Sequence, residues 1–179
     1  MRACNFYFVM SILLAGGCKN EPMKFELAKK QELTGIPSAS GIELTDSGIF
    51  VIGDNSPWLY QLNEEMEIRD RFQLLPERTL PDSIFEKLVK PDFEAICKMD
   101  AAGKKMFIFG SGSKSPERDV LLEVDLSEGF TTREYSMEKF YSTLRSSAKI
   151  TAAELNIEGA EIVNDHLYLL NLGWNHILM

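Results

Sequence analysis

The sequence is poor in cysteine and histidine, and this shortage excludes a structural zinc site. There are 3 cysteines and 2 histidines among 179 residues. Structural zinc sites use four closely spaced Cys or His ligands. His166 and His176 stand ten positions apart, and no cysteine lies near either of them. The sequence therefore predicts no zinc centre.

Clustered positive charge is also missing, and this argues against a nucleic-acid partner. The chain has 19 Lys and Arg residues against 27 Asp and Glu residues, which gives a formal net charge of -8. No run of basic residues occurs anywhere in the chain. Domains that bind nucleic acid usually carry a basic patch or stripe. We therefore expect no nucleic-acid partner.

The first 17 residues have the order of a bacterial signal peptide. Arg2 precedes an apolar stretch, Phe6–Ala15 (FYFVMSILLA), which is too short to cross a membrane. Two glycines follow, and Cys18 comes next, as at a signal-peptidase site. The segment LLAGGC resembles a bacterial lipobox, although Ala15 stands where leucine is more usual. That resemblance implies cleavage before Cys18 and a lipid on its thiol; a signal peptide without lipidation is the alternative.

These features predict three segments: a signal peptide (1–17), a lipidated cysteine with its tether (18–32), and one β domain (33–179). Cleavage would remove Cys4 and the lipid would occupy Cys18. Only Cys97 would remain, in the apolar run FEAIC, so we expect a buried thiol and no intrachain disulfide. The predicted location is the bacterial cell envelope, in the outer membrane or facing the periplasm, with the lipid on Cys18 as the membrane contact.

Short strand patterns separated by turn residues recur three times after the tether. Their first strands read SGIEL, EAICK and EGAEI, and their second strands read IFVIGDN, MFIFGSG and LYLLNLG. The predicted strands are 38–44, 48–53, 58–62 and 66–74, then 93–99, 105–109, 120–126 and 131–135, then 157–163 and 167–170. This layout predicts a repeated antiparallel meander.

Each second strand is an almost unbroken apolar run, which indicates that both of its faces are buried. We therefore predict an all-β fold, a partial β-propeller of about two and a half four-stranded antiparallel blades. A β-sandwich is the alternative, although it would leave one face of each sheet in water.

Two short helical inserts are expected between the meanders. Ser83–Val89 begins with a capping box. In Met137–Leu144, Met137, Phe140, Tyr141 and Leu144 form an apolar stripe that we expect to pack against the sheets.

The blade count does not reach the four that a closed propeller needs. Residues 33–179 are therefore predicted to be an incomplete propeller. Two explanations are open: a fragment or a prematurely ended reading frame, or a ring that is completed by self-association.

The segment FIFGSGSKSPERD, residues 107–119, resembles a phosphate-binding loop at first sight. A Walker A loop needs glycine directly before its lysine and a helix directly after it. Here Ser113 precedes Lys114, Pro116 follows, and a strand pattern begins at Val120. We interpret the segment as the inner strand of the second blade, followed by its polar end and Arg118.

Polar residues at the strand ends are the candidate ligand-binding residues. If the blades surround an axis, equivalent positions of successive blades converge at one mouth of the channel. The residues predicted to meet there are Asp54, Glu94, Ser111, Ser113, Arg118, Glu158 and Asn171. Carboxylate, hydroxyl and amide oxygens suit a polyol, a phosphate-bearing ligand or Ca2+, and the guanidinium of Arg118 suits an anion. Alternatively, these are turn residues and strand ends that satisfy their own backbone.

Glu94 and Glu158 are the strongest candidates. Each lies in an apolar strand, where an unpaired carboxylate would be costly.

The segments IPSASGIEL, PDFEAI, FIFGSGSKSPERD and IEGAEIVNDHLYLLNLG resemble the first repeats of bacterial phytase-like and SdiA-regulated-type β-propellers. The branch they are most similar to is an uncharacterised group of lipoproteins found mainly in Bacteroidetes. The resemblance covers about residues 33–173 and implies a six-bladed propeller, of which this chain holds the N-terminal half. Relatives often carry arginine where Leu172 stands, which weakens the case for a shared anion site.

Three hypotheses follow for the function. The first is a lipid-anchored envelope propeller that binds a small ligand or a partner at the channel mouth. The second is a calcium-dependent phosphomonoesterase that uses Glu94 and Glu158 with Arg118. The third is a truncated chain without function.

Overall fold

The structure, a computed structural model, describes residues 30, 32–78, 84–172 and 176–178. The chain divides into two units, Met1–Lys30 and Gln31–Met179, and every helix and strand described here belongs to the second unit. The predicted signal peptide, Cys18, most of the tether and Ser83 lie outside the described residues. Within the described part of the chain, no helix has the length and apolar character needed to cross a membrane.

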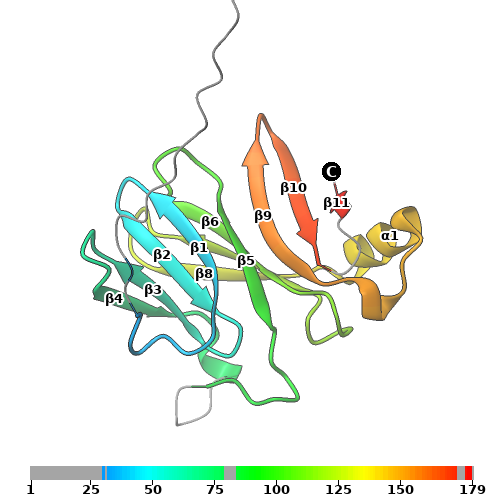
Figure 1. The fold of residues 1–179 in the computed structure, drawn as a ribbon, viewed down its shortest axis with the longest axis horizontal. Helices are drawn as coiled ribbons and strands as arrows, with labels where there is room; N and C mark the ends of the chain where they lie inside the picture. Colours follow the sequence, from blue (N-terminus) through cyan, green and yellow to red (C-terminus); the bar gives the residue numbers. More distant parts are fainter. Residues whose placement is uncertain (1–29, 31, 79–83, 173–175, 179) are drawn as a thin grey trace, which may run out of the picture. The chain divides into compact units, whose positions relative to one another are not determined.

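Within these residues, eleven strands form three antiparallel sheets (Figure 1). The first sheet holds β1 (Ala39–Thr45), β2 (Gly48–Gly53), β3 (Trp58–Leu62) and β4 (Ile68–Gln73); the second holds β5 (Phe93–Lys98), β6 (Lys105–Gly110), β7 (Val120–Asp125) and β8 (Thr131–Ser136); the third holds β9 (Ile157–Val163), β10 (His166–Asn171) and β11 (His176–Leu178). The strands of each sheet are ordered as they are in the sequence. The three predicted meanders are therefore confirmed, and β11 extends the third.

Turn residues fix the register of these hairpins. Gly48, the first residue of β2, adopts φ 134° directly after the turn from β1, a conformation that favours glycine. Asn164 and Asp165 connect β9 to β10 with φ values of 50° and 61°. Two adjacent positive φ values are typical of a type I′ hairpin turn, which matches the twist of the flanking strands.

The second sheet is packed on both faces, as its apolar runs predicted. One face meets the first sheet in a core that includes Phe50, Ile52, Phe93, Ile108 and Leu122. The other face meets the third sheet in a core that includes Ala95, Cys97, Phe109, Ile157 and Leu169. Sheets stacked in this way form the predicted partial β-propeller.

The first strand of each repeat is the innermost one. The contacts between sheets join β1 to β5 and β5 to β9, and Figure 1 shows these strands at the centre of the fold. The prediction that the strand of FIFGSGSKSPERD is an inner strand is therefore wrong, because that strand is β6. Its apolar run arises because β6 lies between two strands of its own sheet and is covered on both faces.

The helix predicted at Met137–Leu144 is confirmed, whereas the one predicted at Ser83–Val89 is not a helix in its described residues. α1 (Glu138–Ala148) follows β8 and buries Tyr141 completely, whereas Phe140 is 40% exposed. In the other insert, Ile84–Val89 forms turns. Phe85 is buried there and its backbone N–H donates to the carbonyl of Asn55, so tertiary contacts override the local helix signal. Two short 3-10 turns, Pro76–Arg78 and Ala152–Glu154, complete the connections.

A segment before β1 partly covers the outer face of the first sheet. Ile36 is buried against Val51, Tyr60 and Leu62, and Leu33 packs on the same cluster. Ile42 and Leu44 of β1, which pair with Val51 and Ile49 of β2, remain exposed.

Candidate functional site

A group of polar side chains lies at one end of the first two sheets. We call it the polar cluster; it consists of Asp54, Lys90, Asp92, Glu94, Ser111, Ser113 and Arg118. Asp54 follows β2, Asp92 precedes β5 and Ser111 follows β6. Because neighbouring strands run antiparallel, the end of one strand lies beside the start of the next. One carboxylate oxygen from each of Asp54, Asp92 and Glu94 lies within 4.8 Å of the others.

Asp92 is the centre of this cluster. Its side chain accepts hydrogen bonds from Ser111 Oγ at 2.8 Å and from Arg118 Nη1 at 2.6 Å. Lys90 Nζ lies 2.8 Å from Asp92 Oδ1 and 2.6 Å from Asp54 Oδ2. Asp92 is only 6% exposed, so its negative charge depends on these partners.

Lys90 links the first two sheets, because its ammonium group pairs with Asp54 at the end of β2 and with Asp92 at the start of β5. Burial alone would oppose the charged form, but hydrogen bonds to Asp54 and Asp92 outweigh it and raise the pKa of Lys90 above its ordinary value. Lys90 therefore stays protonated between two carboxylates, one next to a strand of the first sheet and one next to a strand of the second.

The glycine-serine loop contributes to this network and does not form an open anion site. Arg118 Nη1 donates to Ser113 Oγ at 2.7 Å as well as to Asp92. The hydroxyls of Ser111 and Ser113 lie 2.8 Å apart. The guanidinium predicted to meet an anion is thus engaged by a buried carboxylate of its own chain.

Glu94 is half-buried, and its carboxyl group takes no part in the hydrogen bonds and ion pairs of the polar cluster. Among the described residues, none forms a hydrogen bond or an ion pair with its side chain, and no hydrogen bond contributes to its pKa. Burial, followed by the negative charges of Asp92, Glu158 and Asp54, raises the pKa of Glu94 to about 7, and Lys90 offsets only part of this. Glu94 therefore changes its charge near neutral pH.

The two predicted residues of the third sheet have different environments. Glu158 accepts a hydrogen bond from Asn156 Nδ2 and lies near enough to raise the pKa of Glu94. Asn171 is 1% exposed; its Oδ1 accepts from the backbone N–H of Asn156 at 2.7 Å, and its Nδ2 donates to the carbonyl of Glu154 at 3.0 Å. Asn171 thus satisfies backbone groups that stand 15 and 17 positions earlier in the chain, the kind of role that the alternative interpretation gave to strand ends.

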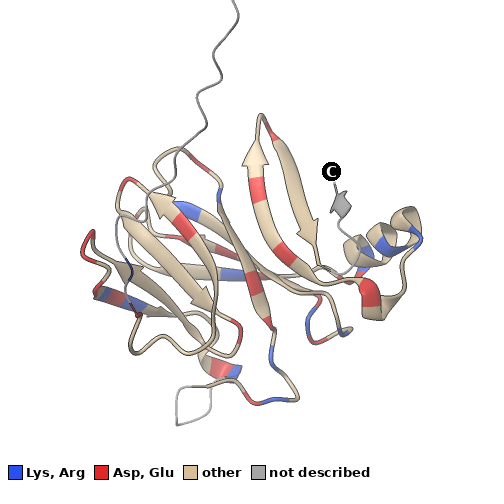
Figure 2. Cartoon of the chain, viewed as in Figure 1, with Lys and Arg blue, Asp and Glu red and all other residues tan. Residues whose placement is uncertain are grey.

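Carboxyl groups outnumber cationic groups in this region. The carboxylates of Asp54, Asp92, Glu94 and Glu158 face the two cations Lys90 and Arg118. Figure 2 shows acidic positions along β5 and β9, the innermost strands of the second and third sheets. The site therefore attracts cations more than anions.

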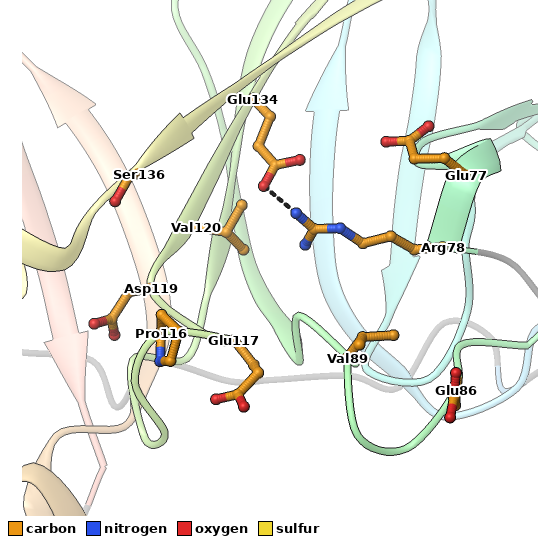
Figure 3. A pocket seen from close by; sticks show the side chains of 10 residues that line it. All are labelled: Glu77, Arg78, Glu86, Val89, Pro116, Glu117, Asp119, Val120, Glu134 and Ser136. Atoms are coloured by element: carbon orange, nitrogen blue, oxygen red, sulfur yellow. Dashed lines mark hydrogen bonds and ion pairs between the residues drawn. The ribbon is translucent and has the colours of Figure 1, made fainter.

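A separate cavity of about 600 Å³ lies outside the polar cluster (Figure 3). Its lining residues are Glu77, Arg78, Glu86, Val89, Pro116, Glu117, Asp119, Val120, Glu134 and Ser136. Arg78 is the one cation among these residues, and it forms an ion pair with Glu134, as Figure 3 shows.

Sequence reasoning did not identify Lys90 and Asp92. The available signal was the dipeptide Pro91-Asp92 directly before an apolar strand, since an acidic residue at that point must either face water or find a partner. Lys90 gave no local signal, because its role depends on Asp54, 36 positions earlier.

Replacement of Glu94 by glutamine should change how stability depends on pH. Since the pKa of Glu94 is about 7 in the folded chain and near 4.5 ordinarily, ionisation opposes folding as pH rises from about 4.5 to 7. We expect Glu94→Gln to raise the free energy of unfolding at pH 8 by about 1 kcal/mol, allowing for solvent screening of a half-exposed group, with no gain at pH 4. Urea unfolding at pH 4, 5.5 and 8 measures this, with Glu64→Gln as the exposed control; equal effects of the two variants would contradict it.

Comparison with known proteins places the chain in one family, and two solved structures are similar to parts of it. A model described as "Family of unknown function (DUF6929)" matches residues 35–177. The WD40 domain of Neurospora crassa Pan2 is 8% identical, with 73% of this chain and 28% of that chain covered and a TM-score of 0.43. Hydrazine synthase of Kuenenia stuttgartiensis is 13% identical, with 86% and 35% covered and a TM-score of 0.46. This chain spans about a third of the length of each, and no curated protein matches it.

Proposed function

The chain belongs to the DUF6929 family of unknown function, and on that premise we propose that it is a binding protein that takes a small cation at the polar cluster. Ca2+ is the ligand whose chemistry suits the cluster best. The observation that carries the proposal is the open carboxyl group of Glu94 beside Asp54 and Asp92, with one oxygen of each within 4.8 Å of the others.

The carboxylate oxygens of the cluster are ligands of the kind that a hard divalent cation prefers. Ca2+ takes carboxylate, carbonyl and hydroxyl oxygens in a flexible geometry. Asp54 Oδ1 is buried and has no hydrogen-bond partner among the described residues. A buried carboxylate oxygen without a partner is costly, and a bound cation would remove that cost. Lys90 already holds the other oxygen of Asp54, so Ca2+ must share or displace its ammonium group.

An anionic ligand has less support in the same region. Both cations of the polar cluster are engaged by carboxylates, and Arg118 also donates to Ser113. A phosphate would have to break these buried pairs and approach four carboxyl groups, which costs free energy.

Titration calorimetry with CaCl2 tests the proposed function. We expect a dissociation constant of about 10⁻⁴ to 10⁻³ M, in the range of extracellular calcium modules, because Lys90 competes for the site. Asp54→Asn and Glu94→Gln should each weaken binding by about tenfold or more, whereas Glu64→Gln in an exposed turn should leave it unchanged. The absence of calcium binding to the unmodified protein at millimolar CaCl2 would refute the proposal.

Hydrolysis of a phosphomonoester is a second candidate function. It rests on the resemblance to phytase-like propellers and on the same three carboxylates, which would hold calcium beside Glu158. Its assay is the hydrolysis of p-nitrophenyl phosphate by the purified protein with and without CaCl2. Calcium binding without calcium-dependent turnover would leave the binding function and remove the enzymatic one.

We also propose that Cys18 carries a lipid that anchors the chain in the bacterial cell envelope. The order of the first 18 residues supports this proposal. In membrane fractionation, Cys18→Ser should move the protein from the membrane fraction to the soluble fraction, while Cys4→Ser, inside the predicted signal peptide, should leave it membrane-bound. A Cys18→Ser protein that stays with the membrane would contradict the anchor.

A further inference from the structure

Lys90 holds the space between the two aspartates of the polar cluster. Its Nζ lies 2.6 Å from Asp54 Oδ2 and 2.8 Å from Asp92 Oδ1. A calcium ion bonds its oxygen ligands at about 2.3 to 2.6 Å. An ion bonded to the same two oxygens would therefore lie at nearly the same distances from them as the ammonium nitrogen does now.

The ammonium group and a metal ion cannot hold that space together. Two positive charges a few Å apart repel each other strongly where water does not screen them. The side chains of Lys90 and Asp92 are only 15% and 9% exposed, so screening is weak here. Arg118 is in a different position, because it holds Oδ2 of Asp92 and leaves Oδ1 to Lys90. The cation that has to leave when calcium binds is therefore Lys90.

The side chain of Lys90 is built to leave. Lysine carries a compact charge on four flexible carbons, whereas the guanidinium of an arginine is a rigid fork. Residues 86–89, directly before Lys90, are all exposed, which places water within reach of a side chain of this length. Departure of Nζ frees Oδ2 of Asp54, and Oδ1 of the same carboxylate is buried without a hydrogen-bond partner among the described residues. Both oxygens then become available to a metal.

We propose that Lys90 is a resident counter-ion, which fills the cation site when no metal is bound and makes the site selective for divalent over monovalent cations. This inference rests on the proposed calcium function and names the residue that sets its specificity. Exchange of the ammonium group for Na+ brings no additional positive charge to the carboxylates, whereas exchange for Ca2+ brings one more. The stem of Lys90 also keeps its charge beside the site, so this competitor acts at a high effective concentration.

The exchange would preserve the link between the first two sheets. Lys90 connects Asp54, after β2, to Asp92, before β5, and calcium bound to both carboxylates connects the same two points. At the other end of these sheets, Glu43 of β1 pairs with Lys98 of β5 at 3.0 Å and takes no part in the exchange. The sheets are therefore held together in both states, and Lys90 can be replaced without separating them.

Titration of the purified protein with CaCl2 in a calorimeter tests the exchange. We expect Lys90→Met, which removes the charge and keeps an unbranched apolar side chain, to tighten calcium binding by about tenfold. Lys87→Met is the matched control, because it removes the same charge from an exposed turn residue three positions earlier. It should change the affinity by less than about twofold, since water and salt screen an exposed charge.

Selectivity is measured by repeating the titrations in NaCl and in tetramethylammonium chloride at equal ionic strength. Both salts screen charge alike, but tetramethylammonium is too bulky to enter a site whose three carboxylate oxygens lie within 4.8 Å of one another. The unmodified protein should bind calcium equally well in both salts. In Lys90→Met, NaCl should weaken calcium binding by about threefold or more relative to tetramethylammonium chloride, because Na+ then competes for the site.

The outcomes separate this inference from the proposed function. Absence of calcium binding to the unmodified protein and to Lys90→Met would remove both. Calcium binding that Lys90→Met leaves unchanged or weakens, or that Lys87→Met tightens as much, would remove the role of Lys90 and leave the calcium site. Weaker calcium binding of the unmodified protein in NaCl than in tetramethylammonium chloride would overturn the selectivity, and this comparison needs no variant. Circular dichroism establishes that each variant is folded.

Discussion

Replacement of Tyr141 by alanine should lower the free energy of unfolding by about 4 kcal/mol, the largest single effect that we expect in this chain. Tyr141 is fully buried on α1 and packs in the core between the second and third sheets. Its hydroxyl donates to the carbonyl of Gly110 at 2.8 Å, so the substitution also leaves a buried acceptor without a donor. Urea unfolding of the variant measures the loss.

Phe140 provides the matched control for this prediction. It precedes Tyr141 on the same helix and has a similar ring, but it is 40% exposed. Phe140→Ala should therefore cost less than about 1 kcal/mol, since both substitutions gain the same helix propensity and differ in buried contacts. Equal losses would mean that α1 does not anchor the two sheets through Tyr141.

Removal of the Asp92 carboxylate should give the second largest effect, a loss of about 3 kcal/mol for Asp92→Ala. The substitution leaves the positive charges of Lys90 and Arg118 facing a site without its central anion. Alanine is also less suited than aspartate to the φ of 56° at this position. The loss is measured from denaturant midpoints at pH 7.

Asp92→Asn separates the charge from the shape of this side chain. Asparagine fits the positive φ and can still accept hydrogen bonds from Ser111 and Arg118. We expect its loss to be about half that of alanine. If Asp92→Asn proves as stable as the unmodified protein, the charge of Asp92 contributes nothing and the network is held by packing alone.

The strands were predictable because short apolar runs bounded by turn residues leave a strong record in the sequence. Gly48–Gly53, Trp58–Leu62 and Ile157–Val163 begin and end where the sequence analysis placed them, since turn residues bound each apolar run. The sequence did not show which strand of each sheet is innermost and which lies between two strands of its own sheet. Hydrophobicity reports how much of a strand is covered, and β6 is covered by its own neighbours as fully as β5.

The candidate site was predictable where it follows from hairpin geometry. Asp54 and Glu94 come together because the end of β2 and the start of β5 share one end of two stacked sheets. Lys90 and the turns of Ile84–Val89 were not predictable, because tertiary contacts hold that insert: Phe85 enters the core and its N–H bonds to Asn55. Asn171 is a different case, a polar strand end whose partners are backbone groups 15 and 17 positions earlier in the chain.

The order of strands within each sheet bears on how the chain folds. Every pair in the three sheets joins neighbours in the sequence, and the turn between β9 and β10 spans two residues. The entropy lost in closing a loop rises with the logarithm of its length, so hairpin formation is inexpensive here. Only the stacking of one sheet on another requires distant segments to meet, and it is there that the cooperativity of folding must arise.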